Sequence, residues 1–91
     1  MNINFSNQII LITGGTRGLG ESFAKKFCML GSKQVIITGS KIKAPTWIKD
    51  KNFKNKIKYI CLDQLSPNFL TELKLFLKKT KKIDILINNA G

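Results

Sequence analysis

The stretch Thr13-Gly14-Gly15-Thr16-Arg17-Gly18-Leu19-Gly20 joins two segments of different periodicity. The side chains of residues 9–12 are all aliphatic, which is typical of a parallel strand buried on both faces, so we predict a strand over residues 8–13. Over residues 18–30 apolar side chains recur at helical spacing, and Gly31 follows as the expected end of that helix. Glycines in a strand-to-helix turn let backbone N–H groups approach an anion at the positive end of the helix dipole. We therefore predict that Gly14, Gly18 and Gly20 belong to the phosphate-binding turn of a dinucleotide site.

The remainder of the chain continues the alternation of strand and helix. We expect further strands at 35–38, 56–62 and 83–87, a weakly patterned helix within 45–53, and a helix that begins with Ser66 as N-cap and Pro67 at its first position. This alternation predicts one domain over residues 1–91, with an α/β fold that forms part of a Rossmann fold. The expected sheet is parallel and four-stranded, in the order 3-2-1-4 with helices on both faces, and ligands bind where the strand order reverses, between strands 1 and 4.

Composition adds few constraints. Sixteen basic and five acidic residues give a net charge of +11, but the lysines are scattered from Lys25 to Lys82, as expected for a solvated surface. A basic nucleic-acid-binding module stays an alternative, although no reader motif accompanies the charge. Cys28 and Cys61 lie far apart on apolar faces, so we expect both to be reduced and buried, without a metal or redox role. The N-terminus does not resemble a secretory signal and no apolar run is long enough to span a membrane, so we expect a cytoplasmic protein.

Three motifs together resemble one family. Thr13-Gly14-x-x-x-Gly18-x-Gly20, Asp63 at the end of the third strand, and Asn88-Asn89-Ala90-Gly91 at the end of the fourth resemble the short-chain dehydrogenase/reductase family. The resemblance covers the whole chain, but only the opening portion of such a domain. It implies that the glycine turn binds the pyrophosphate of a nicotinamide dinucleotide and that Asp63 with Gln64 meets the adenine ring. It further implies that Thr16, Arg17 and Leu19 line the turn, and that Asn88, Ala90 and Gly91 lie along the adenosine ribose.

The end of the second strand indicates which cofactor is bound. NAD sites place an acid there, where it binds the ribose 2′-hydroxyl. Here the sequence is Gly39-Ser40-Lys41, and Arg17 in the glycine turn supplies a second cation. These cations would neutralise the 2′-phosphate of NADP, so we predict NADP over NAD, with Ser40 and Lys41 among the binding residues.

The family's catalytic residues have no counterpart in this sequence. The family uses a tyrosine as acid and base, a lysine three or four residues later, and a serine. The only tyrosine here is Tyr59, which lies inside a predicted strand and is followed four residues later by Asp63. We therefore expect an NADP-binding N-terminal segment of a short-chain oxidoreductase, as a fragment or truncated gene product, without catalytic competence of its own. A non-catalytic dinucleotide-binding remnant or subunit is the alternative.

The fourth predicted strand, over residues 83–87, would be a bare apolar edge of the sheet. We expect this edge to bind a complementing C-terminal segment or a second copy of the chain. The isolated chain is then expected to be poorly soluble or molten.

Overall fold

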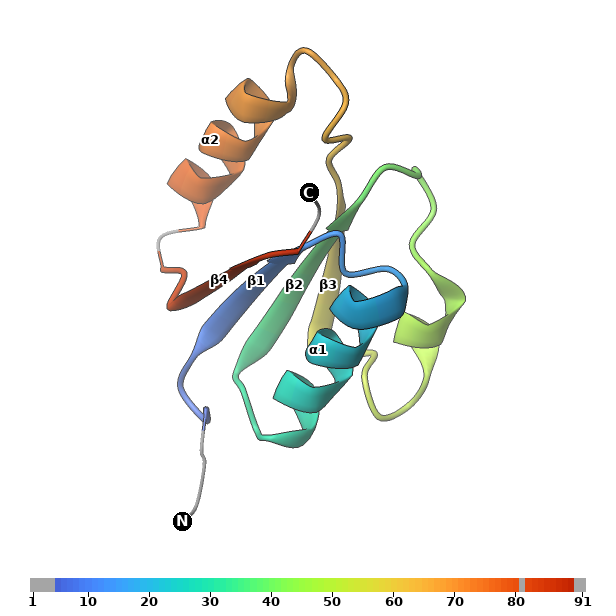
Figure 1. Cartoon of the computed structure of the whole chain (residues 1–91). Helices are drawn as coiled ribbons and strands as arrows, with labels where there is room; N and C mark the ends of the chain where they lie inside the picture. Colours follow the sequence, from blue (N-terminus) through green and yellow to red (C-terminus); the bar gives the residue numbers. More distant parts are fainter. Residues whose placement is uncertain (1–4, 81, 90–91) are drawn as a thin grey trace.

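The computed structural model describes residues 5–80 and 82–89 (Figure 1). Its elements are, in chain order, β1 (Ile9–Thr13), α1 (Gly18–Met29), β2 (Gln34–Gly39), the 3-10 helix η1 (Thr46–Lys49), β3 (Ile57–Cys61), α2 (Phe69–Lys79) and β4 (Ile85–Asn88). The four strands are parallel and lie in the order β3-β2-β1-β4. Figure 1 shows α1 and α2 on opposite sides of this sheet. The predicted partial Rossmann fold and its strand order are confirmed.

The core lies between α1 and the two central strands. Ile10, Ile12, Val35 and Ile37 are fully buried, and they form one cluster with Ala24 and Cys28 of α1. Small side chains on this helix face let its backbone come close to the sheet, while its phenylalanines pack around the contact. The glycine turn that precedes α1 is thereby fixed against the sheet.

The opposite face of the sheet is covered less completely. Side chains alternate between the two faces of a strand, so Leu11 and Ile36, both buried, point away from α1. Helix α2 has no buried residue, and its Leu70 and Leu75 remain 66% and 58% exposed. An apolar surface is therefore left on the α2 side of the molecule.

The end of α1 agrees with prediction. Gly31 adopts a φ of 84°, its N–H donates to the carbonyl of Cys28, and the N–H of Ser32 donates to the carbonyl of Phe27. This pair of bonds closes the helix as a Schellman motif, which needs a residue that tolerates positive φ.

The start of α2 differs from prediction. The helix begins at Phe69, with Asn68 rather than Ser66 in the N-cap position. The Ser66 hydroxyl accepts the N–H of Asn68 at 3.1 Å and its carbonyl accepts the N–H of Phe69 at 3.1 Å. Ser66 thus closes a separate turn before the helix, and the expectation that Ser66 caps the helix with Pro67 as its first residue was wrong.

The connection between β2 and β3 contains less helix than expected. Of the predicted range 45–53, only η1 is helical, and it is a 3-10 helix followed by turns. Pro45 precedes η1, and the backbone N–H of Asp50 ends it by donating to Trp47.

The expectation that both cysteines are buried holds for Cys28 and is wrong for Cys61. Cys61 shares a strand face with Ile57 and Tyr59, but it is the last residue of β3 and pairs in register with Gly39, which has no side chain to cover it. Its Sγ atom lies 3.6 Å from the carbonyl oxygen of Ser40. Strand alternation alone therefore overestimated its burial.

Strand β4 is aligned by a side chain that precedes it. Asp84 accepts the N–H of Ile9 through Oδ2 at 2.8 Å, and its own N–H donates to the Ile9 carbonyl at 2.9 Å. β4 then pairs with β1 from Ile85 opposite Ile10 to Asn88 opposite Thr13. The carboxyl ends of the two strands consequently lie together.

Candidate functional site

A cavity of about 510 Å³, called here the first cavity, lies at the carboxyl ends of the strands. Its lining comes from the glycine turn, from the end of β2, from the segment between β3 and α2, and from Asn89 after β4. The residues are Thr13, Gly14, Thr16, Arg17, Gly18, Thr38, Gly39, Ser40, Leu62, Asp63, Gln64, Leu65, Phe69 and Asn89. This is the edge of a parallel α/β sheet at which ligands bind.

Two N–H groups of the glycine turn are already occupied. The N–H of Gly14 donates to Thr38 Oγ1 at 3.1 Å, and that of Gly15 donates to the Thr38 carbonyl at 3.1 Å. These bonds fasten the turn to β2. They also mean that Gly14 shapes the cavity rather than offering its N–H to a ligand.

The donors available to an anion lie at the start of α1. Arg17 is the N-cap and makes no side-chain capping bond, and the N–H of Glu21 is the one that donates back to the Arg17 carbonyl. The N–H groups of the first helical turn, residues 18–20, therefore have no partner within the helix. Gly18 begins this turn with a φ of 58°, a conformation that favours glycine. The combination of free donors and the helix dipole suits a phosphate.

Gly20 has a packing role. A Cβ at this position would lie 2.7 Å from Asn89 Nδ2 and 2.9 Å from the Gly15 Cα, and closer still to the Gly14 carbonyl oxygen. Only a residue without a side chain lets α1 start so close to the turn. Gly20 thus permits the close packing that shapes the site, but it does not line the first cavity.

Asn89 joins β4 to the glycine turn. Its Nδ2 donates to the Gly14 carbonyl at 3.1 Å and its backbone N–H donates to Thr13 Oγ1 at 3.1 Å. The Thr13 hydroxyl in turn lies 3.2 Å from Asn88 Oδ1, to which it donates. Asn89 and Thr13 line the cavity, whereas the predicted Asn88 is exposed and lines neither cavity. The other two predicted residues of this segment, Ala90 and Gly91, lie outside the described residues.

Asp63 and Gln64, predicted to meet the adenine ring, line the far side of the first cavity. Asp63 Oδ1 accepts the N–H of Leu65 at 3.0 Å, which fixes the carboxylate at the rim. Leu62, Leu65 and Phe69 provide apolar walls beside it. A polar rim with apolar walls suits a flat aromatic base that carries hydrogen-bonding groups.

A second cavity, of about 490 Å³, adjoins the first through Thr16, Arg17 and Ser40. Its remaining lining residues are Lys41, Lys43, Ala44, Pro45, Thr46 and Tyr59. Three cations and no carboxylate therefore border this space. Of the predicted residues, Ser40 and Lys41 line this cavity, and Leu19, 63% exposed, lines neither cavity. Lys43 was not among the predicted residues.

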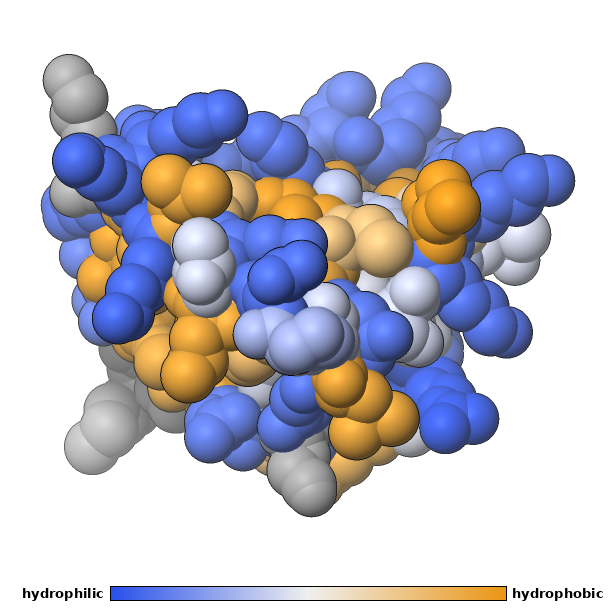
Figure 2. Space-filling view, turned by 90° about the horizontal axis from the view of Figure 1, so that it is seen from above, coloured by the Kyte–Doolittle hydropathy of each residue, from blue (hydrophilic) through white to orange (hydrophobic). Residues whose placement is uncertain are grey.

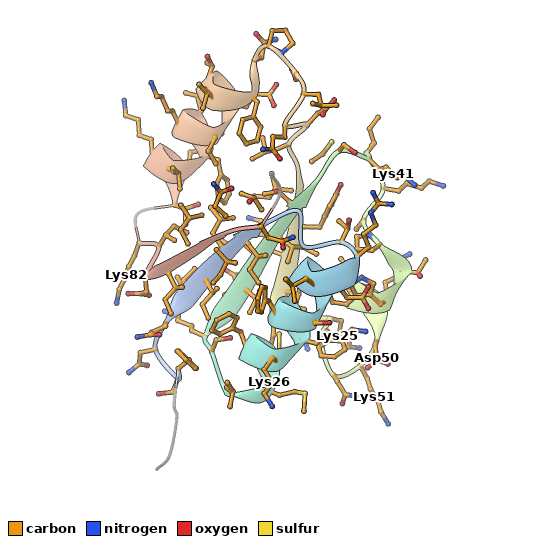
Figure 3. The ribbon with its side chains drawn as sticks, viewed as in Figure 1. Lys25, Lys26, Lys41, Asp50, Lys51 and Lys82 are labelled. Atoms are coloured by element: carbon orange, nitrogen blue, oxygen red, sulfur yellow. The ribbon has the colours of Figure 1, made fainter. Side chains whose placement is uncertain are left out.

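The other lysines do not concentrate at this place. Figure 3 shows Lys41 beyond the end of β2, Lys82 on the opposite side of the molecule beside β4, and Lys51 in the connection after η1. The cations of the second cavity are thus a local group within a dispersed positive charge.

Over residues 5–80 and 82–89, three or more His, Cys, Asp or Glu side chains do not gather where they could hold a metal. Neither described α-helix has the length and apolarity needed to cross a bilayer.

Comparison with known proteins places these features in a family. The model of the short chain dehydrogenases matches residues 8–91. The 3-oxoacyl-(acyl-carrier-protein) reductase FabG of Buchnera aphidicola is 38% identical over 87 residues, which make up 94% of this chain and 35% of the relative. The RhlG/NADP active-site complex of Pseudomonas aeruginosa superposes with a TM-score of 0.83 at 27% identity, over 99% of this chain and 36% of that one. A short chain dehydrogenase of Leptospira borgpetersenii with bound NAD+ has a TM-score of 0.73 at 27% identity, over 97% of this chain and 33% of that one.

The chain thus spans about a third of the length of the proteins that it matches. Solved structures with NADP and with NAD both occur among its structural neighbours, so the likeness alone does not distinguish the two cofactors. Because the family model extends from residue 8 to the end of the chain and the sheet has the expected strand order, the chain belongs to the short-chain dehydrogenase/reductase family of oxidoreductases.

Proposed function

We propose that this chain binds NADP(H) as the N-terminal, cofactor-binding portion of a short-chain oxidoreductase. The observation that carries the proposal is the pair of adjoining cavities that share Thr16, Arg17 and Ser40. The first cavity would hold the adenosine diphosphate part, with the pyrophosphate at the start of α1 and the adenine beside Asp63 and Gln64. The second cavity would hold the 2′-phosphate.

The charge of the second cavity supports NADP over NAD. A 2′-phosphate carries close to two negative charges at neutral pH and is stabilised by charge-assisted hydrogen bonds from Arg and Lys. Arg17, Lys41 and Lys43 border the cavity, and its lining contains no acid that would repel the phosphate or bind a free 2′-hydroxyl. NAD would leave these cations without an anionic partner.

We propose that the chain holds the cofactor without supplying the catalytic acid. Tyr59, its one tyrosine, lies in β3 and donates its hydroxyl proton to the Lys41 carbonyl. With its hydroxyl bonded in this way, Tyr59 forms part of the wall of the second cavity. Its position supports a structural role rather than proton transfer to a substrate.

The test is a calorimetric titration of the chain with NADP, NAD and 2′,5′-ADP at low and moderate ionic strength. We expect NADP and 2′,5′-ADP to bind more tightly than NAD, and this preference to shrink with salt because exposed charges are screened. Arg17→Glu should weaken NADP at least about tenfold while changing NAD much less, since it replaces one phosphate contact by a repulsion. Lys33→Glu, an equal charge change at an exposed position that lines neither cavity, is the control. Equal or tighter binding of NAD by the unmodified chain would contradict the proposal.

We also propose that β4 and α2 are covered by further polypeptide, either a complementing C-terminal segment or a second copy. β4 lies at the edge of the sheet, and its Leu86 is 58% exposed. Leu70 and Leu75 of α2 are exposed as well. Figure 2 shows apolar side chains at the surface in several places between hydrophilic ones. Sedimentation analysis measures the oligomeric state, and a thermal unfolding curve measures cooperativity. A chain that is monomeric at all concentrations and melts cooperatively would count against this proposal.

We further propose a reducing location such as the cytoplasm. Cys28 and the exposed Cys61 are both free thiols in the structure, which fits a compartment that keeps thiols reduced. An exported, oxidised form of the chain would contradict this.

A further inference from the structure

Two aromatic side chains hold the backbone on either side of the second cavity. Trp47 of η1 donates its Nε1–H to the Thr16 carbonyl at 2.9 Å. Tyr59 of β3 donates its hydroxyl to the Lys41 carbonyl. Thr16 directly precedes Arg17, so each accepted carbonyl belongs to a segment that brings a cation to this cavity.

Trp47 is itself held from two sides. Its ring meets that of Phe53 edge-on, with centroids 5.9 Å apart and an interplanar angle of 86°. The Lys25 ammonium lies 5.1 Å from the Trp47 ring centroid, and Glu21 binds the same ammonium at 2.6 Å. Because Lys25 and Glu21 are on α1, these contacts tie η1 to the helix that starts at the glycine turn.

Tyr59 meets the same region from the sheet. It packs against the core cluster while its hydroxyl reaches the loop after β2. A Cβ on Gly39 would lie 2.6 Å from the Thr16 Cγ2 and 2.9 Å from the Tyr59 hydroxyl oxygen, so β2, β3 and the glycine turn converge at this point. Burial raises the pKa of the Tyr59 phenol above its ordinary 10.0, so the hydroxyl stays a donor into the alkaline range.

The segments that these bonds hold have little regular structure of their own. Between β2 and β3 the one helical element is η1, and Arg17, Lys41 and Lys43 are all exposed. Ordering flexible cationic segments around a phosphate costs conformational free energy, and that cost falls when the backbone is already fixed. Trp47 fixes the backbone on one side of the second cavity through the Thr16 carbonyl, and Tyr59 fixes it on the other side through the Lys41 carbonyl.

We propose that Trp47 and Tyr59 are positioning residues that determine specificity: they fix Thr16–Arg17 and Ser40–Lys41 around the 2′-phosphate and thereby set the preference for NADP over NAD. The inference rests on the proposed function. It differs from a general role in folding because NAD, which lacks the 2′-phosphate, places no ionic group in the second cavity.

The experiment uses Trp47→Phe and Tyr59→Phe in the full chain. Each substitution removes one donor and keeps an aromatic ring in place. Binding of NADP, NAD and 2′,5′-ADP is measured by calorimetry, and the melting temperature is recorded for each variant. We expect each variant to weaken NADP and 2′,5′-ADP by about three- to tenfold, the range of one lost hydrogen bond, with NAD changed by less than about twofold.

Phe5→Leu is the packing control. Phe5 meets Phe27 edge-on at 5.2 Å and lines neither cavity, so its replacement should lower the melting temperature and leave the NADP-to-NAD ratio unchanged. The two test residues lie on different elements, so a variant that fails to fold leaves the other to decide.

The outcomes separate the two proposals. If the unmodified chain does not prefer NADP and 2′,5′-ADP over NAD, the proposed function fails and this inference fails with it. If the unmodified chain prefers NADP and a folded variant keeps the full preference, the inference alone is refuted. Equal weakening of NADP and NAD also refutes it, because that result would show a general structural role.

Discussion

The close approach of α1 to the glycine turn gives a sharp test of the structure, because Gly18 and Gly20, two residues apart, should respond differently to the same added methyl group. In Gly20→Ala the new Cβ would fall within 3.0 Å of Asn89 Nδ2 and the Gly15 Cα, and against the Gly14 carbonyl oxygen as well. Two of these three neighbours are backbone atoms, which cannot turn away as a side chain would. The turn, α1 or Asn89 must shift.

The magnitude follows from what has to move. Overpacking a well-packed site costs about 1–3 kcal/mol. Displacing Asn89 also breaks its bond to the Gly14 carbonyl, which adds about 1 kcal/mol. The higher helix propensity of alanine offsets somewhat less than 1 kcal/mol of this destabilisation. We expect Gly20→Ala to lower the free energy of unfolding by about 2–3 kcal/mol, a large share of the stability of a domain of this size.

Gly18→Ala is the matched comparison. Its residue has a φ of 58°, but no atom lies within 4 Å of the added Cβ, so only the left-handed backbone is strained. That strain costs about 1–2 kcal/mol, and Gly31→Ala, with a φ of 84° and equally open space, should cost a similar amount far from both cavities.

Urea unfolding followed by far-ultraviolet circular dichroism, at one protein concentration, measures all three variants. Gly20→Ala should be the least stable, and it should lose dinucleotide binding even where it is folded. A Gly20→Ala variant as stable as Gly18→Ala would refute the geometry of the turn.

Three further predictions concern residues outside the glycine turn. Burial raises the pKa of the Cys28 thiol from 9.0 to about 11, so the unfolded thiol ionises first and the folded state loses about 2 kcal/mol of stability as the pH rises from 9 to 11. The difference in pH dependence between the unmodified chain and Cys28→Ala measures this loss. Thr38→Val leaves the N–H of Gly14 without its acceptor and should cost about 1–3 kcal/mol in urea unfolding, whereas Thr38→Ser should recover most of this loss. Asp84→Ala removes the acceptor of the Ile9 N–H and should cost about 1–2 kcal/mol, with faster hydrogen exchange at that amide; an unchanged exchange rate would contradict the role of Asp84 in aligning β4.

Much of the fold was predictable because its decisive signals are local. The aliphatic runs in β1 and β2 are typical of strands covered on both faces, and Gly31 follows a helical pattern where a left-handed residue is needed. The strand order was predicted from the usual order of doubly wound folds, with right-handed crossovers. Each of these inferences depends on neighbours in sequence or on a general rule.

The errors arose where several local solutions compete. A serine before a proline favours a helix start, but the Ser66 hydroxyl can equally close a turn onto Asn68, and it does so here. Cys61 has the alternation of a buried position, but burial at the end of a strand depends on what lies across from it, and there the neighbour is Gly39. Periodicity does not contain that information.

The candidate site was predictable in its centre and less so at its borders. The glycine turn, Asp63 and the cationic end of β2 were identified from motif spacing, and all lie at the two cavities. Lys43 and the bond from Trp47 to Thr16 depend on the path of the connection after β2, which lacks a regular pattern. One signal was present: Trp47 and Phe53 are large aromatic residues in a lysine-rich connection, which indicates that this connection packs against the rest of the fold.

Asn89 connects two parts of the molecule that differ in what they can bind. It touches the Gly14 carbonyl and the Thr13 hydroxyl on one side, and it continues from β4, the exposed edge of the sheet, on the other. The proposed polypeptide on β4 and the proposed dinucleotide in the first cavity would therefore both act on Asn89. Thermodynamic linkage requires their effects to be reciprocal: if the partner changes the affinity for the cofactor by some factor, the cofactor changes the affinity for the partner by the same factor.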